Sequence, residues 1–323
     1  MIFTLYCGNA RAHSDRGELK IVVQGIQLTL ESSRLMKKIA KKLRGILIPN
    51  KENATRWPEG HRDVYAKLFS KAAIQERRFY NVGAGMNFRH PAWTNVGLIS
   101  EVYGSEHIDL EWDLQLLQEM PVSDASAEIV YTRYTLEHVN DAAVSNFLKE
   151  AYRVLKPGGL LRVIVPDIEV YFAAYQEKDP TLFYKPKRDK QSFPNKKFKS
   201  NPNEASFEQQ FVWVFASGAT EIHNFEGSPR VSDADFLKLL NERSFEDTLN
   251  YCTSLCTPEF QKAFPQFHIN WFHAKKLEEM MREAGFMQTF RSAVGQSRSA
   301  AMHDLNYFDD RRSEIGLFME AIK

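Results

Sequence analysis

Residues 79–85 read FYNVGAG, a short apolar run that passes directly into two glycines. The run is long enough for a buried strand, and Gly83 and Gly85 let the backbone turn tightly and approach a ligand without an intervening Cβ. The same pattern opens the dinucleotide-binding fingerprint, but that fingerprint requires a third glycine three residues later. This chain has Phe88 there. We therefore expect a nucleotide-type cofactor whose binding does not depend on packing a pyrophosphate against a helix N-terminus.

Strand and helix patterns alternate from residue 78 to residue 167. Strands are predicted at 79–82, 93–99, 107–110, 128–132 and 160–165. A helix is predicted at 141–155, beginning at Asn140 or Asp141 and ending at the Pro-Gly-Gly of 157–159. The last strand is almost entirely apolar, as is typical of a strand covered by helices on both faces. The alternation predicts a doubly wound, mainly parallel α/β sheet.

Three further segments surround this predicted core of 76–172. An N-terminal extension covers 1–75 and includes one or two strands in 19–30, with Gly25 as a turn. An insert after the fifth strand covers 173–267, with helices at 208–215 and 233–250. The segment 268–323 is expected to complete the core with a helix at 274–284 and strands at 286–294 and 316–321.

Composition and charge exclude several classes of protein. The chain has 323 residues, of which 43% are hydrophobic, and a formal net charge of +1, so no overall attraction to nucleic acid is expected. Its three cysteines are too few for a disulfide framework. Cys252 and Cys256 lie four residues apart, but no second Cys/His pair has the spacing of a zinc site. We expect buried, reduced thiols, no bound metal and a cytoplasmic location.

No membrane span or signal peptide is predicted. The apolar residues 1–5 lead into a polar segment, and no apolar run approaches the roughly 20 residues that a membrane helix needs. The predicted helix at 34–48 has one apolar face and one basic face, so it could lie on the inner face of a membrane or dock on its own protein. The Lys-rich stretch 184–203 could steer an anionic acceptor or be a solvated loop.

Several motifs in combination carry a family resemblance. They are NVGAG, WTNVGLIS, DLEWDL, MPVSDASAEIVYTRYTLEHV and FLKEAYRVLKPGGLLRVIVPDIE, followed by HINWFHAKKLEEMMREAGF and QSRSA. In this order the chain resembles class I S-adenosylmethionine (SAM)-dependent methyltransferases, in the type 11-like branch found among polysaccharide and cell-surface biosynthesis proteins. The resemblance implies a Rossmann-like methyltransferase fold, SAM as the cofactor and S-adenosylhomocysteine as its product.

The resemblance also implies a set of cofactor-binding residues. Gly83 and Gly85 would flank the methionine part, and Asp113 would contact the adenine side. Gly97 stands where the family usually has an acid that binds the ribose, and Glu101 is the nearest carboxylate after it. The complete set implied by the resemblance is Asn81, Gly83, Ala84, Gly85, Gly97, Asp113, Leu114, Thr132 and Arg133.

On the acceptor side the resemblance implies two catalytic candidates. His138 would face the transferred methyl group, and its imidazole suits a base at cellular pH; Asp167 ends the fifth strand. Glu137 and His138 could instead hold the loop by hydrogen bonds, and Asp167 could cap the following helix. The substrate-side residues are Tyr134, Glu137, His223 and His268, with Tyr134 at a position where relatives tend to have histidine.

The predicted reaction is methyl transfer from SAM to a small acceptor, namely a hydroxyl of a sugar or glycan intermediate. Two alternatives stay open at this point. One is N- or C-methylation of a small metabolite, and the other is a catalytically silent methyltransferase-like partner protein. The missing acid at Gly97 and the tyrosine at Tyr134 favour the silent protein. Neither the atom that is methylated nor the oligomeric state follows from the sequence.

Overall fold

The computed structural model describes residues 10–15, 18–23, 26–30, 57–85, 88–99, 105–183, 204–309 and 313–323. The chain divides into two compact units, Met1–Pro58 with Arg89–Pro91 and Glu59–Phe88 with Ala92–Lys323. In the first unit, β1 (Ala10–Asp15), β2 (Glu18–Val23) and β3 (Ile26–Leu30) form an antiparallel sheet. The strands predicted within 19–30 are β2 and β3. The predicted basic segments at 34–48 and 184–203 lie outside the described residues.

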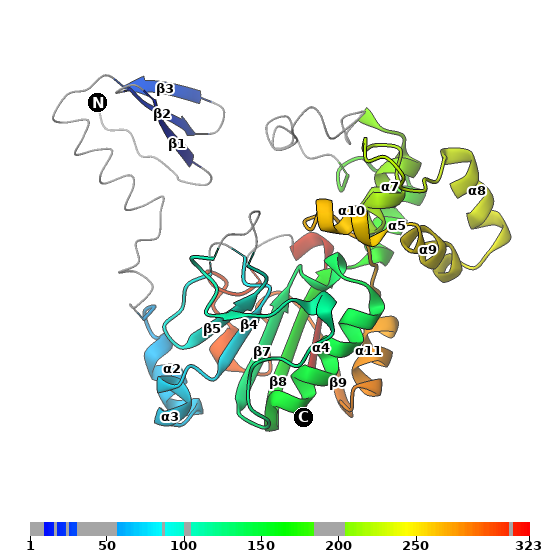
Figure 1. The fold of residues 1–323 in the computed structure, drawn as a ribbon. Helices are drawn as coiled ribbons and strands as arrows, with labels where there is room; N and C mark the ends of the chain where they lie inside the picture. The colour runs from blue at the N-terminus through cyan, green and yellow to red at the C-terminus, as the bar shows by residue number, and fades with distance from the viewer. Residues whose placement is uncertain are drawn as a thin grey trace. The chain divides into compact units, whose positions relative to one another are not determined.

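The second unit is built on a seven-stranded sheet (Figure 1). Its strands are β4 (Phe79–Val82), β5 (Trp93–Gly97), β6 (Leu110–Glu111), β7 (Ala127–Arg133), β8 (Leu155–Pro166), β9 (Gln288–Ser292) and β10 (Gly316–Ile322). The spatial order is β6-β5-β4-β7-β8-β10-β9, and of these seven strands β10 alone runs in the opposite direction to the others. The order reverses at β4 and β7, as in a doubly wound sheet. The predicted fold class, a mainly parallel Rossmann-like sheet, is confirmed.

Helices surround this sheet and form a further group after β8. They are α2 (His61–Leu68), α3 (Lys71–Gln75), α4 (Asp141–Val154), α5 (Ile168–Gln176), α7 (Phe207–Phe215), α8 (Asp233–Glu242), α9 (Phe245–Ser254), α10 (Pro258–Ala263) and α11 (Ala274–Glu283). Short 3-10 helices are η2 (Leu114–Leu116), η3 (Leu136–His138), η5 (Ser217–Ala219), η6 (Ala300–Met302) and η7 (Ser313–Ile315). No helix in the described part of the chain combines the length and apolarity needed to cross a membrane.

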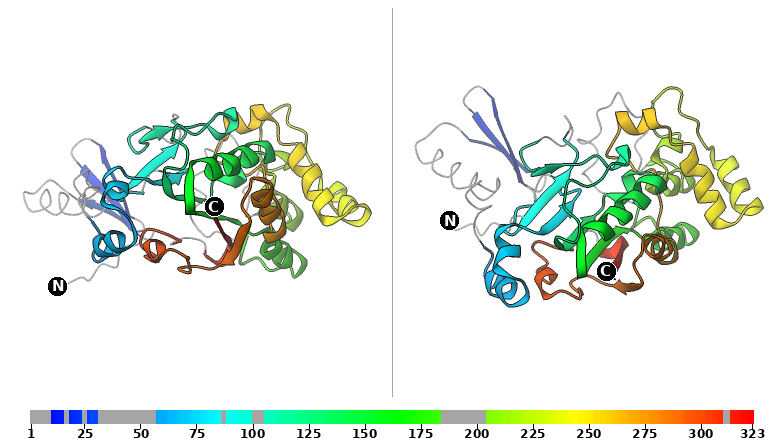
Figure 2. Two further views of the ribbon diagram at one scale, coloured as in Figure 1. Left: turned by 90° about the horizontal axis from the view of Figure 1, so that it is seen from below. Right: turned by 60° about the horizontal axis from the view of Figure 1, so that its bottom comes forward.

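The two faces of the sheet are covered differently. Alternate strand residues, such as Val163 and Met319, pack against α4 and α11 in one apolar core. Figure 2 shows the ribbon of the sheet and its helices from two further directions. The residues between them point to the other face, because successive side chains of a strand alternate. Aromatic rings dominate there: Phe308 packs on Trp93 and Tyr131, with ring centroids 5.1 and 5.5 Å away.

The helices between β8 and α11 form their own apolar cluster. Side chains of α5, α7, α8 and α9 pack around Phe211 and Phe236, both fully buried. Cys252 belongs to this cluster and Cys256 packs against it, and burial raises the pKa of both thiols to about 12. Both cysteines are free thiols, as expected.

The structure corrects some predicted boundaries. The single helix predicted at 233–250 is two helices, because Ser244 begins α9 by accepting a hydrogen bond from the Asp247 amide at 3.1 Å. β8 already begins at Leu155, so the Pro-Gly-Gly of 157–159 lies within its span rather than before it. The third strand is shorter and later than predicted, at Leu110–Glu111. The strand β1 and the helices α2, α3 and α10 were not predicted.

A buried charge cluster joins β8 to the end of the chain. Arg162 lies opposite Glu320 in the β8–β10 register, and its guanidinium contacts the Glu320 carboxylate at 2.7 Å and that of Asp309 at 2.5 Å. All three side chains are at most 1% exposed. Arg162 also donates to Ser292 Oγ and to the carbonyls of Ala293 and Gln296. This cluster ties β9, β10 and the segment between them to β8.

Replacing Arg162 with alanine leaves two buried carboxylates without their cation, so we expect the free energy of unfolding to fall by about 3–5 kcal/mol. The matched control is Arg282→Ala, which removes the exposed Arg282–Glu278 pair on α11. That change should cost less than about 1 kcal/mol. Urea unfolding followed by circular dichroism measures both values, and equal losses in the two variants would contradict the structural role of Arg162.

Candidate functional site

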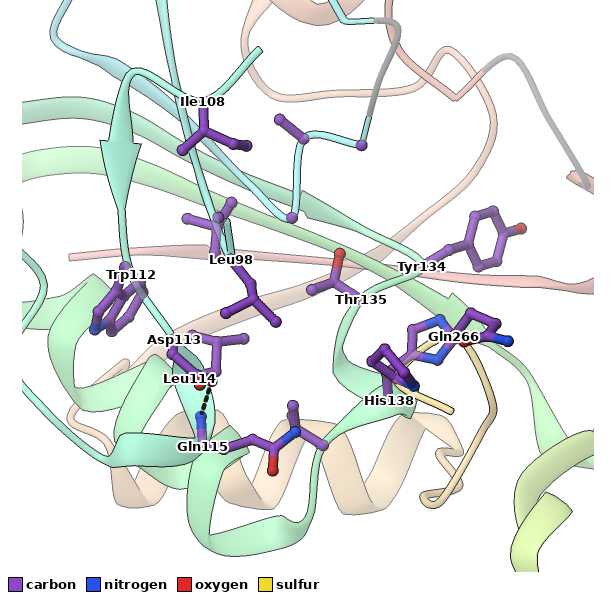
Figure 3. Close-up of a pocket in the computed structure, with 17 residues that line it drawn as sticks. Leu98, Ile108, Trp112, Asp113, Leu114, Gln115, Tyr134, Thr135, His138 and Gln266 are labelled. Atoms are coloured by element: carbon purple, nitrogen blue, oxygen red, sulfur yellow. Dashed lines mark hydrogen bonds between the residues drawn. The ribbon is translucent and has the colours of Figure 1, made fainter. Parts of the chain in front are cut away.

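A cavity of about 330 Å³ opens at the edge of the sheet where β4, β5 and β7 end (Figure 3). Neighbouring parallel strands bring their carboxyl ends to the same edge, and ligands bind there when the strand order reverses. The lining residues are Val82, Gly83, Ala84, Gly85, Gly97, Leu98, Ile108, Trp112, Asp113, Leu114, Gln115, Tyr134, Thr135, His138, Val139, Pro265 and Gln266.

The glycine turn forms one wall of the cavity. Gly83 and Gly85 have φ angles of +73° and +59°, which L-residues rarely adopt. The Gly83 amide donates to the Val96 carbonyl at 2.9 Å, and a Cβ on Gly83 would overlap the side chain of Thr135. A Cβ on Gly85 would meet no atom within 4 Å. Gly83 therefore allows the loops after β4 and β7 to touch, whereas Gly85 exposes its backbone to open space.

The β5 side of the cavity is apolar. Leu98, Ile108 and Trp112 gather at one end, as Figure 3 shows. The Trp112 amide donates to the Gly97 carbonyl at 3.0 Å, which holds the loop after β6 beside the end of β5. A Cβ on Gly97 would lie 3.2 Å from Ile108 Cδ1, so the glycine keeps this end of the cavity narrow but open.

Asp113 supplies a carboxylate to this apolar end. One of its oxygens accepts a hydrogen bond from the Gln115 amide at 3.0 Å and thereby caps η2 (Figure 3). This contact orients the side chain, because the capping oxygen is tied to the backbone. Among the described residues that line the cavity, only Asp113 is acidic. Glu101 lies outside the described residues.

The loop after β7 forms the opposite wall. Tyr134 follows the strand with φ +50°, and its amide donates to the Ile164 carbonyl of β8 at 2.8 Å. A tyrosine in this region of φ is strained, and such strain persists only where the surroundings hold the backbone. The sharp bend sends the chain into η3, whose last residue is His138. Tyr134, His138 and Gln266 lie at one end of the cavity, away from Leu98 and Ile108 (Figure 3).

Backbone contacts clamp η3 to the segment that precedes α11. The carbonyl of Glu137 accepts from the amides of Ile269 and Asn270 at 2.8 and 3.2 Å. The carbonyl of His138 accepts from the Gln261 side chain, and the Asn270 side chain donates to the Val139 carbonyl. These contacts fix the position of His138 at the cavity wall.

The same segment positions two imidazoles and a carboxylate close together. The ring centroids of His138 and His268 are 4.9 Å apart at 74°. His138 Nδ1 lies 3.1 Å from the Phe267 carbonyl, and His268 Nδ1 lies 2.5 Å from the Val214 carbonyl. Glu137 Oε1 is 3.9 Å from His138 Nε2, and the Glu137 side chain is 2% exposed.

Two predicted site residues lie elsewhere. Asp167 caps α5 by accepting from the Glu169 amide at 3.1 Å, and its other oxygen contacts Arg291 at 3.3 Å. Burial raises the pKa of the Asp167 carboxyl. His223 is fully buried between the Gly218 carbonyl and the Phe225 amide, which it contacts at 2.9 and 3.1 Å. Neither residue lines the cavity.

The other predicted residues divide between the cavity wall and the layer behind it. Gly83, Ala84, Gly85, Gly97, Asp113, Leu114, Tyr134 and His138 line the cavity. Asn81 and Thr132 are buried within β4 and β7, and Arg133, Glu137 and His268 also lie outside the lining set. Sequence reasoning missed Val82, Leu98, Ile108, Trp112, Gln115, Thr135, Val139, Pro265 and Gln266. Most of these residues are direct neighbours in sequence of a predicted site residue. That proximity is the one sequence signal that could have identified them as part of the cavity wall.

The different surroundings of the two glycines lead to a stability test. Gly83→Ala combines a left-handed φ with overlap on Thr135, so we expect it to lower the free energy of unfolding by about 2–5 kcal/mol. Gly85→Ala carries only the conformational cost of about 1–2 kcal/mol. Urea unfolding of both variants measures the difference. A Gly85→Ala loss as large as that of Gly83→Ala would contradict the described contact between the two loops.

Comparisons with known proteins find similarity to methyltransferases. Residues 92–163 match the family described as Methyltransferase domain. A Mycolicibacterium smegmatis protein described as a probable S-adenosylmethionine-dependent methyltransferase is 28% identical over 128 residues, which cover 37% of this chain and 49% of that protein. The match thus spans about half the length of this curated relative.

Solved structures of methyltransferases also resemble the chain. One is a SAM-dependent methyltransferase of Thermotoga maritima described as a possible histamine N-methyltransferase, with 14% identity, a TM-score of 0.35 and coverage of 89% of this chain and 97% of that one. Another, from Mesorhizobium loti, has 12% identity, a TM-score of 0.36 and coverage of 81% and 96%.

Because both TM-scores are below 0.5, the fold is established by the order of the strands and not by the similarity to these structures. The description of the curated relative names S-adenosylmethionine as its cofactor. The matched segment runs from the start of β5 into β8 and includes β7, whereas β4, the other strand at the reversal of strand order, precedes it. Residues 92–163 are thus similar to a methyltransferase domain, and the order of the seven strands is that of a doubly wound α/β fold.

Proposed function

We propose that SAM binds in the cavity at the ends of β4, β5 and β7, and that this protein transfers its methyl group to a hydroxyl of a sugar or glycan intermediate. The observation that carries the proposal is the division of one cavity into an apolar end and a hydrogen-bonding end. A cofactor with an aromatic base suits the first, and a hydroxyl-rich acceptor suits the second.

The residues present fit the cofactor. Gly85 leaves space that a side chain would fill, so backbone amides of the glycine turn can approach the methionine part of SAM. Leu98, Ile108 and Trp112 form an apolar slot for the adenine ring. The Asp113 carboxylate, oriented by its cap, can accept from the adenine amino group or a ribose hydroxyl. Asp113 would thereby provide an acidic contact on the side where Gly97 has no side chain to offer.

When bound, SAM supplies an electrophilic methyl group on a sulfonium. The task of the protein is then to position the acceptor oxygen and to assist the loss of its proton. His138 is suited to this task because η3 holds it at the hydrogen-bonding end of the cavity. Since Nδ1 donates to the Phe267 carbonyl, a neutral ring presents the lone pair of Nε2. Asp167 does not line the cavity, so we propose His138 as the residue that assists proton loss.

The segment 173–267 would define the acceptor side. Pro265 and Gln266 come from this segment and line the cavity beside His138. Aromatic side chains of Phe260, Phe264 and Phe267 form a buried cluster directly before His268, so this wall is rigidly supported. The side-chain amide of Gln266 can both donate to and accept from a hydroxyl, which suits a sugar.

Cofactor binding is tested by isothermal titration calorimetry with S-adenosylhomocysteine. We expect wild-type protein to bind it and Gly85→Arg to lose binding, because the new side chain would occupy the space beside the glycine turn. Gly158→Arg is the matched control, since Gly158 also has a positive φ of +79° and open surroundings but lies at the other end of β8. Absence of binding to the folded wild type would refute the proposal.

The proposed role of His138 is tested with labelled SAM and a panel of nucleotide sugars and glycosides. The product should carry an O-methyl group, and His138→Ala should lower kcat by about 100-fold while calorimetry still shows S-adenosylhomocysteine binding. Asp167→Asn keeps a capping oxygen and should change kcat less than about 2-fold. A methyl group on nitrogen or carbon, or an equal loss in both variants, would contradict the assignment.

A further inference from the structure

We propose that Glu137, His138 and His268 form a binding site for a divalent transition metal ion of the zinc type, beside the acceptor end of the cavity. One possible ligand atom from each residue lies within 4.8 Å of the other two. Two imidazoles and one carboxylate are a ligand set that catalytic zinc sites use, with a fourth position left to water or substrate. The sequence did not predict this site, because its three ligands do not have the paired Cys/His spacing that is typical of zinc sites.

The hydrogen bonds of the two imidazoles suit metal binding. His138 Nδ1 and His268 Nδ1 each face a backbone carbonyl, of Phe267 and Val214 respectively. A carbonyl only accepts, so each Nδ1 must carry the hydrogen and each neutral ring has its lone pair on Nε2. Metal-binding histidines usually donate their second ring nitrogen in this way, which fixes the orientation of the ring. Both rings are therefore held in the tautomer that a metal ion requires.

Glu137 provides the anionic ligand. Its carboxylate is 2% exposed, and Oε1 already lies 3.9 Å from His138 Nε2. A cation beside the carboxylate would offset part of the cost of burying its negative charge. The backbone of Glu137 is tied to Ile269 and Asn270, next to His268 in the chain, so the ligands from the two segments are held by the same contacts.

The spacing requires only a small contraction. Ligands about 2.1 Å from a tetrahedral ion lie about 3.4 Å from one another, so the widest pair would approach by roughly 1.4 Å. Rotation of side chains can supply such a shift without moving the clamped backbone. Imidazole nitrogens favour zinc and neighbouring transition metals over magnesium or calcium. Because His138 lines the cavity, the open fourth position would face the acceptor.

The role of the ion rests on the proposed function. An acceptor hydroxyl in the fourth position would become more acidic, as metal-bound water does. Its O–H bond would break with the proton passing to water, and the oxygen would attack the methyl group with the electron pair it keeps. The bond between the methyl carbon and sulfur would break, and S-adenosylhomocysteine would leave with that electron pair. His138 would then assist proton loss by holding the ion.

The test uses tag-free, full-length protein that has been stripped with a chelator and titrated with Co²⁺. Wild-type protein should bind one equivalent, with the intense visible absorption of a four-coordinate site, and Zn²⁺ should displace it. Glu137→Gln and His268→Ala should each weaken Zn²⁺ binding by more than about 100-fold. Losing a hydrogen bond that supports a ligand already lowers metal affinity by about 10–100-fold, and losing the ligand itself should lower it further. His303→Ala, at an exposed histidine outside the cluster, should leave binding unchanged.

Two further measurements keep the outcomes distinct. Thermal unfolding confirms that each variant is folded, and Glu137→Gln preserves side-chain shape if His268→Ala does not fold. S-adenosylhomocysteine calorimetry in the presence of the chelator tests the cofactor site independently of the metal. Absence of Co²⁺ absorption, or equal Zn²⁺ affinity in wild type and both cluster variants, would overturn the metal proposal even where S-adenosylhomocysteine still binds.

Discussion

The parallel pairing of β4 with both β5 and β7 is the constraint on which the site depends. Val82 lies in register with Val96 on one side and Thr132 on the other. The residues that follow these positions therefore leave the sheet at the same level, and their three loops must share one edge. Gly83 resolves the resulting crowding, because the loop after β7 brings Thr135 into the space that a Cβ would occupy. The cavity is the space left where these loops diverge.

A second constraint is the clamp between η3 and the segment before α11. The Glu137 carbonyl accepts two backbone amides from that segment, and side chains of Gln261 and Asn270 reach neighbouring carbonyls. This clamp ties the helices after β8 to the sheet edge beside the cofactor cavity. It also explains how a loop with the strained Tyr134 can hold His138 in one orientation. The proposed acceptor site and metal site both depend on it.

Much of the fold could be predicted because its signals are local. The apolar runs of β4, β5 and β7 and the Asn140 cap of α4 act within a few residues, and these four elements are present. Long-range pairs carried no such signal. Arg162 stands within an apolar strand, and its partners Asp309 and Glu320 lie 147 and 158 residues further along. The break between α8 and α9 was missed although Ser244 marks it, since the apolar pattern continues across the cap.

In the site, too, local features could be predicted from the sequence and long-range contacts could not. The sequence alone determined that a tight glycine turn follows the first core strand, because glycine adopts positive φ angles without the steric cost that a Cβ brings. It also predicted mainly parallel strands, whose following loops share one edge of the sheet. Only the tertiary structure decided what those loops present: Asp167 turns to cap α5, whereas His268 comes from 130 residues beyond His138 to lie beside it. The reason is physical, since side-chain direction depends on contacts between distant segments, and those contacts form only when the whole sheet has assembled.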